Sequence, residues 1–387
     1  MKNLKKILAL VLAFACAFTM FAGAAFTDQA DIKVENEVVD TLIELGVING
    51  YTDGSFKPND TVTRAEMAKM IYVLRTGNSD ASAYNNDKTS FTDVNGHWAA
   101  GFIKYCQSVG IIAGQSATKF APDQTVTAQE AAKMLLVTLG YDATKAGLVG
   151  INWASKTNAL ADENGLLDDV NTSFTGPCPR QYAAQLIYNA IDTPTVVWRD
   201  DAYTNVNVLG DDNQTIGEKY MDLYKTSAEV LTSVKKTSGK DTYEIKLADK
   251  VKYADDKKEQ EFTKVPTDVS DLLGLKVKVL VRVKTNGDQD VYGVYADDDS
   301  KVIATGTVGQ LESVGAASDK KTKLAGTEYK MDKANNKLKV IYANKGVSTD
   351  TVATIEQATA IDQVAGTVKL VDTDGNNKVD TVVVTPA

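Results

Sequence analysis

Histidine and cysteine are almost absent from this chain, which has one histidine and three cysteines among 387 residues. A zinc site of the HExxH type needs two histidines, so His97 alone excludes it, and a histidine-based catalytic triad would depend on this single residue. Cys106 and Cys178 stand in no metal-ligand spacing and do not make a disulfide framework. We expect both to be buried as small apolar side chains, and His97 to be structural.

The chain also lacks an excess of positive charge. Its 42 Lys and Arg against 51 Asp and Glu give a formal net charge of −9, which argues against a general nucleic-acid binder. The sequence has no Gly-x-Ser-x-Gly nucleophile elbow and no phosphate-binding loop. No pair of acidic residues is set apart as a general acid and base, so we expect no enzyme and no required cofactor.

Long apolar runs are confined to the N-terminal segment 1–24. Three lysines precede an apolar stretch over 7–21, and Ala22-Gly23-Ala24 fits a signal-peptidase cleavage site. No later segment approaches the length of a membrane span. The sequence therefore predicts a signal peptide at residues 1–24 and an exported protein with no membrane span.

What the chain does contain is an internal repeat. The segment Gly46-Val47-Ile48-Asn49-Gly50 matches Gly110-Ile111-Ile112-Ala113-Gly114, and a threonine, Thr63 or Thr127, follows each segment at the same distance. A diverged third copy places Trp153 before Gly165 at the interval that separates Trp98 from Gly110. The three copies cover residues of about 26–77, 91–141 and 147–193.

Each copy carries two amphipathic helical patterns. The second helix of the first two copies starts with a capping box, Thr63-x-x-Glu66 and Thr127-x-x-Glu130. Helix pairs that cannot bury their apolar faces alone should pack against one another. Residues 25–193 are therefore predicted to form an all-α pseudo-trimer of helix pairs.

These motifs resemble those of S-layer homology domains. The FTDV…HWA…GII.G segment, the GY.DGSF.PN turn and the TRAE helix start carry the resemblance, which extends over the three copies. Such domains occur as three tandem copies on exported bacterial proteins. The resemblance implies non-covalent attachment to secondary cell-wall polysaccharide, an anionic and often pyruvylated polymer, and a location at the cell wall or surface layer.

A helix start that holds an arginine can bind an anion, because unpaired backbone amides and a guanidinium then lie together. This favours Arg64, with Gly50, Asp53 and Gly54 in the turn before it. Arg64 could instead pair with surface acids, and the tryptophans could pack in the core. The full set of expected polymer-binding residues is Arg64, Gly50, Asp53, Gly54, Asp93, Trp98, Trp153 and Arg180.

The copies are not equivalent at these positions. Ala128 replaces the arginine in copy two, Tyr182 replaces the glutamate in copy three, and Val34 replaces the tryptophan in copy one. We expect one or two working sites, with Arg64 and the first turn dominant and Arg180 secondary. Because Arg64→Ala would leave the Thr63–Glu66 cap in place, the sequence predicts little change in stability from it.

Residues after 194 have strand character. Runs rich in Val, Thr and Lys alternate with turn signals at Ser238-Gly239 and Asn286-Gly287. We expect two small all-β domains, residues 194–300 and 301–387. The predicted strands are Thr195–Arg199, Ala228–Lys235, Thr242–Leu247, Leu275–Lys284, Asp290–Tyr295, Val302–Val308, Lys337–Tyr342, Thr367–Val371 and Lys378–Val384.

One loop in the last domain could bind calcium. Asp372, Asp374, Asn376 and Asp380 match positions 1, 3, 5 and 9 of a calcium loop. Asn377 stands where the turn glycine belongs, and Val383 where the bidentate glutamate belongs. A hairpin turn between two strands is the favoured interpretation, with a weak calcium site as the alternative.

The sequence thus favours a structural protein of the cell surface, anchored by its repeats and extended by β-domains that form or join a surface layer. A wall-anchored adhesin or ligand-binding module is the alternative, and a wall-bound enzyme is a more distant one. An S-layer subunit should self-associate in solution, whereas an adhesin should not.

Overall fold

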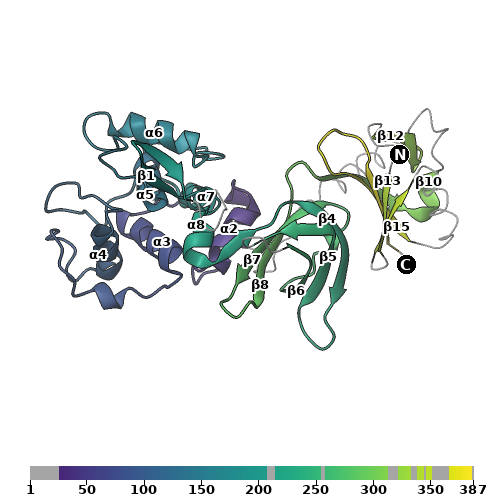
Figure 1. Cartoon of the computed structure of the whole chain (residues 1–387), viewed down its shortest axis with the longest axis horizontal. Helices are drawn as coiled ribbons and strands as arrows, with labels where there is room; N and C mark the ends of the chain where they lie inside the picture. The colour runs from purple at the N-terminus through teal and green to yellow at the C-terminus, as the bar shows by residue number, and fades with distance from the viewer. Residues whose placement is uncertain are drawn as a thin grey trace. The chain divides into compact units, whose positions relative to one another are not determined.

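The computed structural model describes residues 26–206, 214–253, 258–312, 321–332, 338–343, 346–350 and 366–385. The signal peptide predicted at 1–24 lies outside these residues. Contacts divide the chain into two compact units, and the division falls between Leu223 and Tyr224. Helices dominate the first unit and strands the second (Figure 1).

Each of the three copies contributes two helices to the first unit, as predicted. The second helix of each copy packs against the second helix of a neighbouring copy. Its first residue is Arg64 in copy one, Ala128 in copy two and Arg180 in copy three. The helices are α2 (Asn36–Glu44), α3 (Arg64–Thr76), α4 (Ala100–Ser108), α5 (Ala128–Leu139), α6 (Trp153–Glu163) and α7 (Arg180–Ile191). Both predicted capping boxes are present, at Thr63 and Thr127.

A closed ring of three backbone hydrogen bonds joins the copies. The amide of Val62 donates to the carbonyl of Cys178 (3.0 Å), that of Cys178 to Val126 (2.9 Å), and that of Val126 to Val62 (2.9 Å). The three residues are at most 1% exposed and stand shortly before α3, α5 and α7. The ring therefore marks the pseudo-threefold axis. Cys178 in the ring and Cys106 on α4 are both buried, as expected.

The first unit continues beyond the third copy. The hairpin of β1 (Val196–Arg199) and β2 (Ala202–Asn205) packs closely on the end of α5, since a Cβ atom on Gly140 would lie 2.1 Å from the Val196 carbonyl oxygen. Helix α8 (Ile216–Met221) lies against α3 and α7. The predicted domain boundary between residues 193 and 194 therefore differs from the observed boundary after Leu223. The reason is that the β1–β2 hairpin and α8 pack against the helices of the repeats.

The second unit starts with a meander and a hairpin. Strands β4, β5 and β6 pair in order, β4 also pairs with β7, and β7 pairs with β8, all antiparallel. Strand β6 lies beside β8 and closes a five-stranded Greek-key barrel. The strands are β3 (Leu223–Lys225), β4 (Glu229–Lys236), β5 (Tyr243–Lys252), β6 (Lys258–Val265), β7 (Lys276–Val283) and β8 (Gln289–Ala296).

A five-stranded sheet of order β14-β13-β16-β15-β9 follows the barrel. Ile341, Val371 and Val383 from this sheet share one apolar core with the barrel strands, so the residues on either side of 300 belong to one compact unit. The remaining strands are β9 (Lys301–Thr307), β10 (Leu311–Glu312), β11 (Lys321–Leu324), β12 (Thr327–Lys330), β13 (Leu338–Tyr342), β14 (Gly346–Asp350), β15 (Thr367–Asp372) and β16 (Thr381–Thr385).

The fold class is the predicted one, a helical repeat region followed by small β-sheets. Within the described ranges, none of the helices has the length and apolar character that crossing a bilayer requires.

Candidate functional site

A cavity of about 290 Å³ opens where the three copies meet. Its walls combine cationic, acidic, aromatic and apolar groups from all three copies. The lining residues are Arg64 of copy one, Ile111 to Gln115, Glu130, Lys133 and Met134 of copy two, and Val149, Gly150 and Trp153 of copy three. The cavity therefore offers both charged groups and apolar surface to a ligand.

Arg64 lies in the wall of this cavity and is itself 6% exposed. Its Nε donates to the carbonyl of Phe120 (2.9 Å), and one terminal nitrogen donates to the carbonyl of Ala113 (2.8 Å). The other terminal nitrogen pairs with Glu130 Oε1 at 3.1 Å. Arg64 therefore ties the first copy to the turn and the second helix of copy two.

The free amides expected at the start of α3 are absent. The amide of Arg64 donates to Gln124 (2.8 Å), that of Ala65 to Pro122 (3.0 Å), and that of Glu66 to the Thr63 hydroxyl (3.2 Å). An anion at this helix start would have to displace backbone bonds between copies. The expectation of unpaired amides at this helix start is therefore wrong, because copy two and the Thr63 cap use these donors.

Arg64 was expected to act together with the first turn, but its hydrogen bonds go to Phe120, Ala113 and Glu130 of copy two. Arg180 contacts that turn instead: its terminal nitrogen donates to the Asn49 carbonyl, and its guanidinium lies 5.0 Å from the centre of the Tyr51 ring. The Nε of Arg180 is buried without a hydrogen-bond partner among the described residues. Each arginine thus serves the turn of the next copy around the ring, which sequence order alone does not indicate.

Gly50, Asp53 and Gly54, which were expected to bind the polymer, have structural roles in the first turn. Asp53 accepts hydrogen bonds from the Ser55 amide (3.0 Å) and hydroxyl (2.6 Å), which lower its pKa. Gly50 cannot carry a side chain, because a Cβ atom would lie 2.8 Å from the Phe26 ring. Gly54 has a φ of +80° in the same turn. These three residues shape the first turn.

Asp93 fixes the corresponding turn of copy two through hydrogen bonds with its backbone. Its two carboxylate oxygens accept the amides of Phe120 (3.0 Å) and Ala121 (2.9 Å). Burial alone would raise the pKa of Asp93, but these hydrogen bonds outweigh it and the pKa is lowered. His97 is structural as expected: Nδ1 accepts the Ala99 amide, which leaves Nε2 to donate to Asp123 at 3.1 Å.

The two tryptophans of the repeats are accessible. Trp98 is 57% exposed, and Trp153 is half-buried in the cavity wall. Packing of both in the core, the common role of tryptophan, is not what the structure shows. The ammonium of Lys133 lies 5.3 Å from the centre of the Trp153 ring, so a cation and an aromatic surface stand together at the cavity.

Sequence reasoning missed Lys133, Gln115 and Val149. Lys133 stands one helical turn after Glu130, and on a helix this spacing places both on one face. That signal was readable once Glu130 had been identified as the end of a capping box. The contribution of Val149 depends on the packing of copy three against copy two, which no local pattern reveals.

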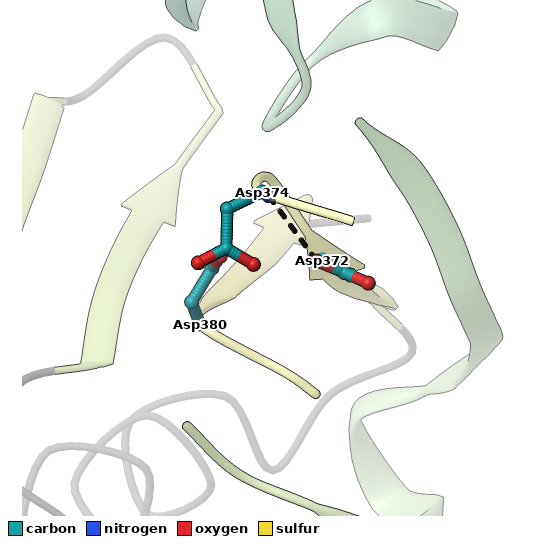
Figure 2. A group of neighbouring side chains, drawn as sticks. All are labelled: Asp372, Asp374 and Asp380. Atoms are coloured by element: carbon teal, nitrogen blue, oxygen red, sulfur yellow. Dashed lines mark hydrogen bonds between the residues drawn. The ribbon is translucent and has the colours of Figure 1, made fainter. Parts of the chain in front are cut away.

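The predicted calcium loop has the hydrogen bonds of a tight turn. Figure 2 shows Asp372, Asp374 and Asp380 converging at the end of β15, and their carboxylate oxygens lie within 4.8 Å of one another. Fully buried Asp372 accepts the amides of Asp374 (3.2 Å), Gly375 (2.9 Å) and Asn377 (2.6 Å). Asn377 adopts the left-handed φ of 61° that the missing glycine would supply.

The remaining groups of this loop are also engaged. Asp380 accepts the amide (2.9 Å) and hydroxyl (2.8 Å) of Thr373, and the Asn376 side-chain oxygen accepts the Lys378 amide (2.9 Å). Burial raises the pKa of Asp374, as do the hydrogen bond that its protonated carboxyl donates to Asp372 and the charges of Asp380 and Asp372. These bonds account for the loop as a turn, while the three close carboxylates keep the calcium hypothesis open to test.

Comparison with known families identifies the repeats. The model of the S-layer homology domain matches residues 25–68 and 90–132, which lie in the first two copies. The geometry of the ring adds residues 147–193 as a third copy. The chain therefore contains S-layer homology repeats over residues 25–132.

Similar proteins are surface proteins and at least one enzyme. A "Cell surface protein" of Thermoanaerobacter kivui is 28% identical over 88% of this chain and 40% of its own length. A "Surface layer protein" of Brevibacillus choshinensis is 30% identical over 48% and 16%. An "Exoglucanase XynX" of Acetivibrio thermocellus is 28% identical over 44% and 16%. This chain spans less than half the length of each.

Proposed function

We propose that residues 26–193 anchor the protein non-covalently to an anionic secondary cell-wall polysaccharide, and that the strand-rich unit forms or joins a surface layer. The cavity between the copies is the observation on which the proposal depends. It brings Arg64, Lys133 and Trp153 together in a space of about 290 Å³. Cations suit the charge of such a polymer, and an indole suits the C–H face of a sugar.

The match of residues 25–68 and 90–132 to the S-layer homology domain supports the same function, as does the similarity to surface proteins. The alternative is an adhesin whose strand-rich unit binds a ligand. No catalytic constellation stands out among the described residues, and we propose a structural protein without enzymatic activity.

Binding to isolated walls tests the anchor. The full chain should sediment with walls of its source organism, and purified wall polysaccharide fragments should compete it off. Walls stripped of the polymer by hydrofluoric acid should bind little. Equal binding to intact and stripped walls would contradict the proposal.

Self-association tests the surface-layer role separately. Protein at high concentration should form ordered sheets visible by electron microscopy, with or without added calcium. A chain that stays monomeric but binds walls would favour the adhesin alternative.

A further inference from the structure

Arg64 and Lys133, the two cationic side chains that line the cavity, differ in the hydrogen bonds that they already make within the protein. The Arg64 guanidinium donates through all three of its nitrogens, to Phe120, Ala113 and Glu130. Those bonds satisfy two backbone carbonyls and add a cation to the Glu130 carboxylate, which also accepts hydrogen bonds from Gln115 and Thr127. Because Glu130 also balances its charge, Arg64 has little left for a ligand.

Lys133 is in the opposite situation. It lies on α5 one turn after Glu130, lines the cavity and is half-buried. Across the described part of the chain it makes no hydrogen bond or ion pair, and its one polar contact is with the Trp153 ring. The half-buried ammonium has lost part of its hydration, and the Trp153 ring and the charge of Glu130 compensate for it without a hydrogen bond.

We propose that Lys133 is the residue that binds the negative charge of the wall polymer, while Arg64 is a positioning residue that holds the cavity wall. This assignment rests on the anchoring function proposed above. A carboxylate or phosphate of the polymer would accept hydrogen bonds from the Lys133 ammonium, and the attached sugar ring would lie against Trp153.

Burial of Lys133 agrees with this assignment. Desolvation lowers its pKa, Glu130 opposes the shift, and Arg64 adds to it. A bound anion would offset both unfavourable effects. At this helix position copy one also carries a lysine, Lys69, whereas Gln185 in copy three is buried and donates to Asn189 at 2.9 Å.

The test compares Lys133→Met and Lys133→Arg with the parent. Met keeps the aliphatic stem and removes the charge, whereas Arg keeps the charge. Lys88→Met removes one charge from an exposed loop of the same unit and serves as the control. The probe is binding of the full chain to isolated walls, with and without blocking of their carboxyl and phosphate groups, over a series of salt concentrations.

We expect Lys133→Met to weaken binding about ten- to a hundredfold, the worth of one charged hydrogen bond, and to lose most of the salt dependence. Its unfolding midpoint should match that of the parent, and Lys133→Arg and Lys88→Met should bind almost as the parent does. Parent-like binding by Lys133→Met, alongside a parent that distinguishes blocked from unblocked walls, would overturn the assignment and leave the anchor intact. A parent protein that does not bind isolated walls would overturn both the Lys133 assignment and the proposed anchoring function.

Discussion

Arg64 of the first copy and Glu130 of the second form an ion pair at 3.1 Å inside the wall of the cavity. The pair sits between copies, so it links two helix starts that are distant in the sequence. Its side chains are 8% and 22% exposed, which makes it a largely buried interaction whose loss leaves one charge without a partner.

Arg64→Ala should therefore destabilise the helical unit, contrary to what the sequence suggested. The substitution removes the pair and leaves the carbonyls of Phe120 and Ala113 unsatisfied, at a cost of about 2–4 kcal/mol. Thermal unfolding followed by helical circular dichroism measures it. Arg199→Ala, at an exposed position of β1, is the control and should change little. An Arg64→Ala variant with parent-like unfolding would show that the pair contributes nothing to stability.

The two repeat tryptophans should contribute unequally to wall binding. Trp153 lines the cavity, and Trp98 lies in another copy, outside the residues that line it. Trp153→Ala should lower affinity for isolated walls by about tenfold, the scale of one aromatic contact, and Trp98→Ala by less. Wall-binding isotherms of the two variants compare them directly. A larger loss of affinity for Trp98→Ala than for Trp153→Ala would place the main binding site at the first turn, which Arg180 contacts.

Asp40→Asn should stabilise the protein at neutral pH and have no such effect in acid. Burial, with Glu44 nearby, raises the pKa of Asp40 from 3.8 to about 6. The folded state therefore holds this proton more tightly, and stability falls as pH rises from about 4 to 6. The gain on substitution should be about 1–2 kcal/mol above pH 6, after allowance for partial exposure. Asp162→Asn on α6 is the control, and unfolding at pH 4 and pH 7 is the measurement.

Two substitutions separate a turn from a metal site in the loop of Figure 2. Asp372→Asn should cost about 1–3 kcal/mol even in a chelator, because three amides lose their carboxylate acceptor. Asp374→Asn should be neutral or slightly stabilising there, since it removes a carboxylate whose pKa is raised by burial and by its acidic neighbours Asp372 and Asp380. Calcium should leave this pattern unchanged. Stabilisation of the parent by calcium that Asp374→Asn abolishes would instead establish the metal site.

Local signals in the sequence predicted much of the fold. Repeat spacing and the Thr63 and Thr127 capping boxes located the helices that line the site, and the Ser238-Gly239 and Asn286-Gly287 turns located two hairpins. Each of these signals acts over a short stretch of chain. Strand β6 was missed because Lys and Glu are frequent in it and its buried residues Phe262 and Val265 are three positions apart, which breaks the period-two pattern of a strand.

The arrangement of the site was harder to predict because it depends on contacts between copies. Nothing near Arg64 in the sequence indicates that its guanidinium meets the turn at Ala113, or that Arg180 meets the turn at Asn49. The ring of Val62, Cys178 and Val126 sets these partnerships. Residue types at the site were therefore predictable, and their partners were not.

The ring of Val62, Cys178 and Val126 also sets the number of copies that can assemble around the axis. Every copy offers one donor and one acceptor that only another copy can satisfy, so two copies leave the ring open and a fourth has no place in it. A fragment holding a single copy could complete the ring only by meeting two further molecules. Tandem fusion removes the dependence on concentration that such an assembly would have.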